Sequence, residues 1–532
     1  MSAHESKVVN ETTRSVLEAR ACDPVGDDEV LARLGKRPVL KRKFDFMALL
    51  GLTCTILSTW EGMLVMFVEP LLNGGPAGVV YSYIVAWIGT TATFITFAEM
   101  VSMAPTSGGQ YHWAMMLAPR SSFRFTGFLA GYLTTFGWQA SVAAVGYMMG
   151  NMIQGLIVLT HPTYEPQAWH LTLLMFLTLA CAAFVNVAAS GLLPKVERLA
   201  LVLHILGFFA ILIPLVYLGE HNSAQFVFTS FLNGGHFETQ GLSFMVGMTG
   251  SMFAFTGADA AFHMAEEINN AAVVIPRSIF ASVLLNGILG FGMVIAALFA
   301  TTDVNSALQT KTGYPFIAIL QQATGSVAGS AAMTSLILVL GLGGFVGAVA
   351  SSSRMIWSFA RDRGLPGWAL LQRVDTRTSI PVVAVGVTTL VACLLGLITL
   401  GSPTVFNDMI SLSLSSLFLS YLISMCLLLW RRCTGRIRSL CSLSTTEPVY
   451  NTPGAPLVWG PFYLDGFWGI LVNVFSIIYL VVGVFFSFWP PSASVDGPTM
   501  NYSVVGTGGV VILSTLYYLV IAKREFRGAV VE

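Results

Sequence analysis

Long apolar segments recur along most of this chain, and they constrain its fold more strongly than any other feature of the sequence. Many of them run for roughly 20 residues or more, the length that a helix needs to cross the hydrocarbon core of a bilayer. Hydrophobic residues make up 55% of the chain and charged residues only 10%, whereas a soluble domain carries about 25% charged residues. The short alternating pattern of a membrane β-barrel does not occur. The sequence therefore predicts an all-α integral membrane protein.

Twelve such segments can be delimited by the glycine, proline and charged residues that flank them. An even number of spans would place both ends of the chain on the same side of the membrane. We expect the spans at 44–72, 79–103, 125–157, 170–190, 197–218, 241–263, 278–301, 328–359, 381–400, 404–430, 466–488 and 506–522.

The basic residues test this count, because Lys and Arg gather on the cytoplasmic side of membrane proteins. With twelve spans, 26 of the 27 Lys and Arg residues fall on the side of the two termini, and Lys311 alone falls on the other. We therefore expect cytosolic segments over 1–43, 432–465 and 523–532. The first 43 residues are polar and lack an early apolar stretch, so we predict a disordered tail rather than a cleaved signal peptide.

The loop after the eleventh span would then be external. It contains Asn501-Tyr502-Ser503, an N-glycosylation sequon. We predict Asn501 as a glycan acceptor, although the short loop leaves its occupancy open. For the location of the protein we predict the plasma membrane, with the vacuolar membrane as the alternative.

Two of the apolar segments contain a polar break, and each break holds a carboxylate. The first reads Ser58-Thr59-Trp60-Glu61-Gly62 and the second reads Phe255-Thr256-Gly257-Ala258-Asp259. A charge in the middle of a membrane is costly and usually marks a pathway or a binding site. Interrupted helices in matching places of two halves indicate the substrate site of a secondary transporter.

The spacing of the spans also indicates two repeats. Spans 1 and 6 hold the breaks, spans 3 and 8 are the two longest, and both pairs are five spans apart. Because five is odd, the second set would start from the opposite face of the membrane, as in the inverted-repeat plan of transporters. We expect the repeats over 44–218 and 241–431, with two added spans over 466–522.

The broken spans and their neighbours carry a series of motifs in a fixed order: Leu72–Pro76, Ala98–Met100, Pro105–Tyr111, Gly257–Glu267, Ile275–Arg277 and Ala360–Pro366. The series resembles the amino acid–polyamine–organocation permeases, in particular the fungal-type branch for amino acids, choline and GABA. The resemblance covers about residues 40–525. It implies a five-plus-five inverted-repeat fold like that of the leucine transporter, alternating access, and transport of small amines or amino acids.

The two breaks would form two walls of one substrate site, since a broken helix exposes N–H groups that favour a carboxylate and carbonyl groups that favour an ammonium ion. Glu61 could pair with a substrate ammonium or carry a proton, or it could be a protonated group bonded to a neighbouring helix. Asp259 could belong to the site or form a structural ion pair, and the aromatic residues could face a cation or simply pack. The predicted substrate-binding residues are Thr59, Trp60, Glu61, Gly62, Phe253, Phe255, Thr256, Gly257, Ala258 and Asp259.

In related proton-coupled permeases, a basic residue of span 5 takes the place of a sodium ion. His204 falls close to the corresponding position, seven residues after Glu197. Histidine titrates near neutral pH, so we predict His204 and Glu61 as coupling residues, with a proton as the coupling ion and sodium less favoured. The alternative for His204 is a neutral imidazole buried in the core.

Other functional classes find little support in the sequence. A Ser/His/Asp set, an HExxH motif and a GxxxxGK[ST] loop are all missing, which argues against a membrane enzyme and an ATP-driven pump. The seven cysteines show no CxxC spacing, so we expect no metal site, and we expect no cofactor and no nucleic-acid partner. The partners we expect are a small amine or amino acid, the coupling proton and the bilayer. A choline or polyamine permease, an exporter of an amine-containing metabolite and a nutrient sensor of the same fold remain alternatives, and the oligomeric state stays open.

Overall fold

The structure of the protein is a computed structural model, which describes residues 26–401, 405–439, 450–497, 499–526 and 528. Helices account for nearly all of its regular structure. Two strands of two residues, β1 (Ile437–Arg438) and β2 (Leu457–Val458), pair in parallel. The longer helices are α3 (Phe46–Leu57), α4 (Thr59–Val65), α5 (Val68–Met103), α7 (Phe123–Thr160), α8 (Ala168–Ala188), α9 (Leu193–Leu218), α11 (Gln240–Ala254), α13 (Ala271–Phe299), α16 (Val327–Arg361), α18 (Val382–Ile398), α19 (Val405–Cys433), α20 (Gly466–Ser487) and α21 (Ser503–Tyr517).

Shorter helices lie between and beyond the long ones. They are α2 (Asp27–Arg33), α6 (Gln110–Leu117), α10 (Ala224–Thr229), α12 (Ala260–His263), α14 (Val304–Leu308), α15 (Pro315–Thr324), α17 (Trp368–Leu371) and α22 (Lys523–Glu525), with 3₁₀ turns at Ser190–Leu192 and Ala265–Glu267 and a π-helical stretch at Tyr518–Ala522.

Ten helices within the described residues are long and apolar enough to cross a membrane, and α18 is a shorter apolar helix. The helix α5 contains Gly75 at a φ of +67°, which divides it into two helical parts. The sixth predicted span coincides with α11 and the short α12, which are separated by a non-helical stretch. The prediction of an all-α, multi-pass membrane protein is therefore confirmed, while the count of twelve spans stays a prediction.

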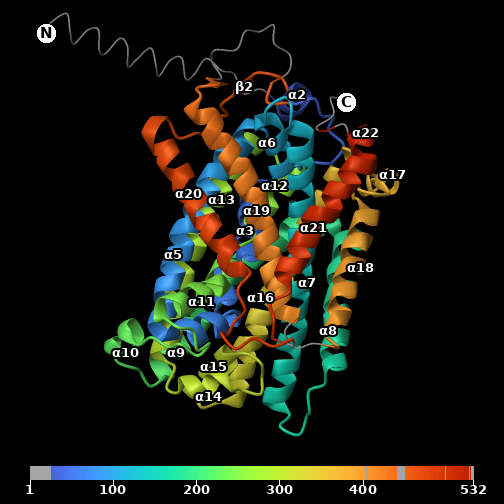
Figure 1. Cartoon of the computed structure of the whole chain (residues 1–532). Helices are drawn as coiled ribbons and strands as arrows, with labels where there is room; N and C mark the ends of the chain where they lie inside the picture. The colour runs from blue at the N-terminus through green and yellow to red at the C-terminus, as the bar shows by residue number, and fades with distance from the viewer. Residues whose placement is uncertain (1–25, 402–404, 440–449, 498, 527, 529–532) are drawn as a thin grey trace, which may run out of the picture.

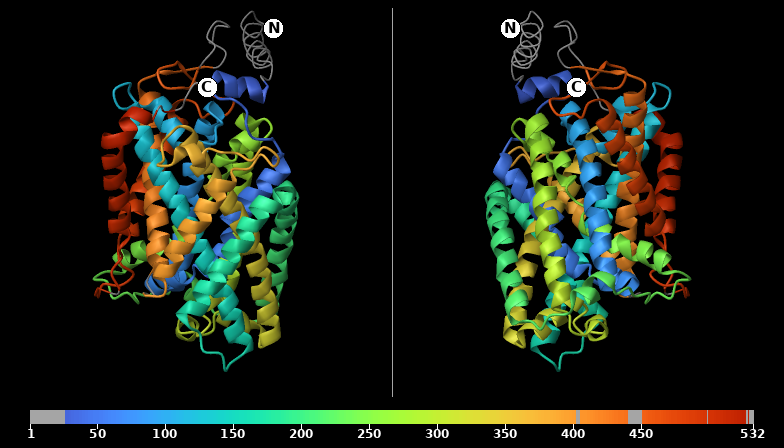
Figure 2. Two further views of the ribbon diagram at one scale, coloured as in Figure 1. Left: turned by 90° about the vertical axis from the view of Figure 1, so that its right-hand side faces the viewer. Right: turned by 90° about the vertical axis from the view of Figure 1, so that its left-hand side faces the viewer.

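The helices form one bundle with α2 and α22 at the same end (Figure 1). We call this end the terminal face and the other end, which carries α10, α14 and α15, the far face. The broken helices α3–α4 and α11–α12 lie inside the bundle. Helix α5 packs against α11 and α13, and α7 packs against α16 and α19. Helices α20 and α21 lie on one side of the bundle (Figure 2).

The first break is made by Ser58, a non-glycine residue in the left-handed region with a φ of +36°. Its hydroxyl donates to the carbonyl oxygen of Thr55. The break leaves the next backbone amide without a helical partner, and the amide of Thr59 donates instead to the side-chain oxygen of Asn286 on α13, at 3.0 Å. A side chain of another helix thus satisfies the interrupted backbone.

The second break is made by Gly257, which has a φ of +122°. A Cβ atom at this position would lie 2.9 Å from the side chain of Ile56 in the first broken helix. Glycine is therefore required twice, by the backbone conformation and by the close approach of the two breaks. The breaks lie in the first helical unit of each predicted half; the boundaries of the two inverted repeats stay a prediction.

The segment before α3 departs from the predicted disordered tail of residues 1–43. Residues 1–25 lie outside the described residues, but α2 is helical and Leu31, Leu34 and Leu40 are buried against the terminal face. Phe44 forms a parallel β-bridge with Ile268. The leucines explain the difference, because they give an otherwise polar segment an apolar side that the bundle covers.

Candidate functional site

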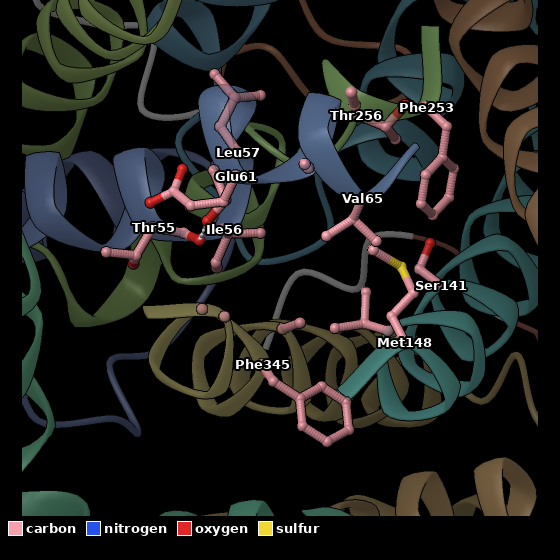
Figure 3. A pocket seen from close by; sticks show the side chains of 18 of the residues that line it. Thr55, Ile56, Leu57, Glu61, Val65, Ser141, Met148, Phe253, Thr256 and Phe345 are labelled. Atoms are coloured by element: carbon pink, nitrogen blue, oxygen red, sulfur yellow. Dashed lines mark hydrogen bonds between the residues drawn. The ribbon is translucent and has the colours of Figure 1, made fainter. Parts of the chain in front are cut away.

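The two breaks border a cavity in the interior of the bundle, with about 820 Å³ of space between atoms, part of which is open to solvent. In Figure 3, Glu61 lies beside Thr55 and Ile56, while Phe253, Ser141 and Met148 lie on the opposite side of the drawn residues. The lining comes from α3, α4, α7, α11, α16 and α19. It consists of Thr55, Ile56, Leu57, Ser58, Glu61, Gly62, Val65, Met66, Trp138, Ser141, Val145, Met148, Met149, Met152, Phe253, Ala254, Thr256, Gly257, Ile337, Gly341, Gly344, Phe345, Ala348 and Leu417.

Half of the predicted substrate-binding residues line this cavity, and half do not. Those that line it are Glu61, Gly62, Phe253, Thr256 and Gly257. The others lie behind its walls: Thr59, Trp60, Phe255, Ala258 and Asp259, all of which are buried.

Glu61 is the only ionisable side chain among the described residues that line the cavity. Its Oε1 lies 2.7 Å from Nδ1 of His204 on α9. Both side chains are almost completely buried, and Glu61 Oε2 and His204 Nε2 have no hydrogen-bond partner in the described structure. The sequence singled out both residues, and the fold makes them a pair.

Two of the three predicted aromatic residues, Trp60 and Phe255, pack against other side chains and do not line the cavity. The Trp60 ring lies 5.8 Å from the His204 ring and 6.3 Å from the Phe208 ring, measured between centroids. The Phe255 ring lies 5.0 Å from the ring of Tyr83 on α5. Trp60 therefore packs behind the Glu61–His204 pair, and Phe255 packs between helices.

Asp259 lies on the terminal side of the cavity, within a second polar cluster. Its Oδ2 accepts hydrogen bonds from Nε2 of Gln110 at 3.2 Å and from Nε1 of Trp138 at 3.1 Å. His263 Nε2 lies 4.0 Å from the same oxygen. Because Trp138 lines the cavity and Asp259 does not, the indole of Trp138 separates the carboxylate from the cavity.

Sequence reasoning missed the contribution of α7 and α16, which supply many of the lining residues. Met148, Met149 and Met152 of α7, together with Met66 beyond α4, form what we call the methionine wall. Helices α7 and α16 correspond to the two longest predicted spans, 3 and 8. Their unusual length was the one sign in the sequence that they differ from the other spans. Periodicity alone could not identify the faces of these helices, since both are apolar nearly all around.

Buried ion pairs lie between Trp138 and the terminal face. Arg354 Nε donates to Glu267 Oε1 at 2.8 Å, and the Arg361 guanidinium makes two hydrogen bonds with Glu266, at 2.7 and 2.9 Å. We call these four residues the terminal seal. Burial alone would raise the pKa of Glu266, but the charge and hydrogen bonds of Arg361 outweigh it and lower the pKa below its ordinary value.

The segment before α3 adds a further pair to this region. Lys36 Nζ lies 2.6 Å from Asp362 Oδ1, and both side chains are almost completely buried. The hydroxyl of Tyr111 donates to the other oxygen of Asp362 at 2.9 Å. Charged and aromatic side chains thus fill the bundle between the cavity and the terminal face.

Asn501, the predicted glycan acceptor, is 5% exposed. Its amide nitrogen, the atom to which a glycan is attached, donates to the carbonyl oxygens of Ser487 at 2.9 Å and Trp489 at 2.8 Å. Glycosylation at Asn501 stays a prediction, and it would have to precede the packing of this segment.

The hydrogen bond between Trp138 and Asp259 yields a first prediction. The substitution Trp138→Phe keeps an aromatic ring at the cavity but removes the N–H donor, so Asp259 loses this bond and keeps the one from Gln110. A hydrogen bond to a charged group contributes about 1.5–3 kcal/mol. We expect a lower melting temperature and a KM for uptake that rises several-fold or more, measured in proteoliposomes.

The matched control is Trp113→Phe, which removes an indole hydrogen bond to the Ala104 carbonyl away from the cavity. Its melting temperature should fall while its KM stays unchanged. Equal KM values for the two variants would show that Trp138 has only a packing role.

Comparison with known proteins agrees with this architecture. Residues 44–510 match the family described as amino acid permease. The chain is 31% identical over 456 residues to a putative amino acid/polyamine transporter of Macrophomina phaseolina, covering 86% of this chain and 96% of that protein. It is 30% identical over 489 residues to a choline transporter of Saccharomyces cerevisiae, covering 92% and 83%.

A GABA-specific permease of the same yeast is 25% identical over 520 residues, covering 96% of this chain and 86% of that protein. These proteins are transporters rather than enzymes, and the similarity extends over the whole bundle that holds the cavity. The chain therefore belongs to the amino acid permease family, within the amino acid–polyamine–organocation superfamily.

Proposed function

We propose that this protein is a proton-coupled secondary transporter for amino acids, GABA or related small amines, which works by alternating access. The observation that carries the proposal is the Glu61–His204 pair, a buried carboxylate–imidazole contact of 2.7 Å at the edge of the cavity between the two breaks. Titratable groups inside a membrane protein usually mark a transport pathway.

The substrate ammonium would bind at Glu61. Its Oε2 is buried without a partner, so it can accept a charge-assisted hydrogen bond. The backbone N–H of Gly257, which lines the cavity, donates to no partner in the described structure. It offers a donor for a substrate carboxylate, and the two groups together suit a zwitterion.

The coupling proton would bind the Glu61–His204 pair. When His204 is protonated it forms an ion pair with Glu61; when it is neutral, the carboxylate is free to attract a cation from the cavity. Protonation and substrate binding thereby depend on the same carboxylate. Sodium coupling is the less favoured alternative, and it would appear as a requirement for sodium in transport.

A choline or polyamine permease is a second candidate, because the cavity pairs one carboxylate with a largely apolar lining. Such a lining suits an alkylated cation that carries no carboxylate. One of the relatives is named a choline transporter. Export of an amine-containing metabolite and nutrient sensing are further alternatives within the same fold.

We further propose that the protein resides in the plasma membrane, with the vacuolar membrane as the alternative, and that the terminal face is cytoplasmic. The distribution of Lys and Arg supports this orientation, because these residues lie almost entirely on the side of the termini.

The test is uptake of a panel of radiolabelled amino acids, GABA, choline and polyamines in a permease-deficient host at two external pH values, with and without sodium. The proposal expects uptake of at least one amino acid or GABA, stimulated by low external pH and independent of sodium. Inhibition by choline and by no amino acid would favour the second candidate. A sodium requirement would contradict proton coupling.

A further inference from the structure

Glu197 is a buried carboxyl group on α9, four residues after the first residue of the helix. Its side chain is fully buried, with 0% of the residue exposed. It contacts α3, where a Cβ atom on Gly51 would lie only 2.3 Å from the Glu197 carbonyl oxygen. The two helices are thus in close backbone contact at the level of this carboxyl group.

The Glu197 carboxyl group has a hydrogen-bond partner for only one of its two oxygen atoms in the described structure. Oε2 lies 2.8 Å from the hydroxyl oxygen of Thr55, and Oε1 has no partner in the described structure. No ion pair joins Glu197 to a described Lys, Arg or His, although Arg198, the next residue, is half exposed and pairs with Asp45 at 2.6 Å. A buried carboxylate with one neutral donor and no cation is costly.

The other charged and titratable groups around α9 are engaged elsewhere or exposed. Three of these groups on the packed helices and on α9 itself are exposed: Lys195, Tyr217 and Arg277. The others are the Asp45–Arg198, Arg354–Glu267, Arg361–Glu266 and Glu61–His204 pairs and the buried thiol of Cys54. None of these makes a hydrogen bond or ion pair with the Glu197 carboxyl group in the described structure.

The Thr55 hydroxyl can bond both the Glu197 carboxyl group and its own helix only when Glu197 holds a proton. Its oxygen lies 2.9 Å from the Gly51 carbonyl oxygen and 2.8 Å from Glu197 Oε2, but a hydroxyl carries a single hydrogen. If Glu197 is ionised, that hydrogen must go to Glu197. If Glu197 is protonated, its own O–H donates to Thr55, and the Thr55 hydrogen is released to Gly51.

We propose that Glu197 is a second proton-binding site of the transport cycle, connected to the substrate cavity through the Thr55 hydroxyl. The ligand is a proton from a hydronium ion: one O–H bond of hydronium breaks and leaves water, and one O–H bond forms on the Glu197 carboxylate. This inference rests on the proton-coupled transport proposed above. It adds a site that is distinct from the Glu61–His204 pair.

The position of Glu197 suits a proton that leaves toward the terminal face. Thr55 lines the cavity, whereas Arg198 beside Glu197 reaches the protein surface. Glu197 and His204 are seven residues apart, about two helical turns along α9, and both are buried. The first broken helix, α3–α4, and α9 therefore hold one titratable site at the level of the break and another nearer to the terminal face.

The test compares purified wild-type protein with Glu197→Gln in proteoliposomes, using a substrate found by the uptake panel. Two assays are needed: exchange of substrate at equal pH on both sides, and accumulation driven by a pH gradient. Glu197→Gln should keep exchange within about twofold and lose at least tenfold of the accumulation, about 1.4 kcal/mol for each factor of ten. Glu220→Gln, an exposed glutamate beyond the end of α9, is the matched control and should behave like the wild type.

A second pair of variants keeps the test decisive if Glu197→Gln does not fold. Glu197→Asp retains an ionisable group and should accumulate substrate, whereas Glu197→Asn, of the same size, should not. Accumulation by Glu197→Gln or Glu197→Asn at the level of the acidic variant would overturn the proposal, because a hydrogen-bonding role alone would then suffice. If sodium restored accumulation only in the wild type and Glu197→Asp, which carry a carboxyl group, the proton site would be overturned in favour of a metal-cation site.

Failure of the proposed function looks different. If wild-type accumulation ignores the pH gradient, proton coupling itself is wrong, and the Glu197 site falls with it. If the wild type follows the gradient and Glu197→Gln does so equally, only the Glu197 inference is wrong.

Discussion

The substitution Glu61→Gln is expected to abolish concentrative uptake while the protein still reaches the membrane. Glutamine keeps the size of the side chain but removes the only ionisable group among the described residues lining the cavity. Truncating one partner of a buried charge pair costs about 2–5 kcal/mol, which corresponds to a loss of roughly 30- to several thousand-fold in kcat/KM at 1.4 kcal/mol per factor of ten. The measurement is initial uptake against substrate concentration, normalised to surface protein.

The control for this substitution is Glu69, which lies in the same predicted span, 44–72. Glu69 borders a separate pocket with Asp408 and Asn501 and does not line the cavity, so Glu69→Gln should retain at least half of the wild-type kcat/KM. His204→Gln keeps the Glu61 carboxylate but removes its titratable partner, and it should retain substrate binding while losing the stimulation by acid. Uptake by Glu61→Gln at the wild-type level would remove Glu61 from both proposed roles.

Breaking the terminal seal should have the second large effect. The substitution Glu267→Met leaves the Arg354 guanidinium, 2% exposed, without its carboxylate partner. Removing one member of a buried ion pair costs about 3–5 kcal/mol. We expect a marked fall in the temperature at which the detergent-solubilised protein loses monodispersity, and we expect greater access of thiol reagents to cysteines introduced near Asp259.

Two further variants separate charge burial from mere contact. The double variant Arg354→Met with Glu267→Met removes both charges and should recover most of the lost stability, since apolar replacements of a buried pair are often neutral. Glu29→Gln breaks an exposed pair with Arg33 on α2 and should change stability by about 1 kcal/mol or less. A double variant as unstable as the single one would mean that the seal stabilises the fold by its geometry and not by its charges.

The class of fold could be predicted from the sequence because membrane helices carry their signal in consecutive residues. Length, hydropathy and the sorting of Lys and Arg are local properties, and most helix bounds follow them closely. Helix α5 is an exception, because it includes the end of the first predicted span and all of the second. The positions of the breaks were also visible, since Ser58-Thr59 and Thr256-Gly257 interrupt apolar runs. The all-α membrane fold is thus the confirmed prediction, and it depends on residues that are neighbours in the chain.

Contacts between segments that are distant in the chain could not be predicted from the sequence. The pairing of Glu61 with His204 spans 143 positions, and the bond from Trp138 that separates Asp259 from the cavity spans 121. Both depend on how α4, α7, α9 and α12 rotate about their axes, which nearly uniform apolar helices do not specify. For the same reason Trp60 was expected in the site, whereas the packing of α4 against α9 turns its ring toward Phe208.

The methionine wall gives the cavity a surface that is both adaptable and chemically sensitive. Thioether side chains are flexible and can fit amines of different outline, so selection at this wall would depend on charge more than on shape. Oxidation of these sulfur atoms to sulfoxides would turn an apolar surface into a polar one. Because Met66, Met148, Met149 and Met152 all line one cavity, such a change would alter the surface that a transported molecule meets.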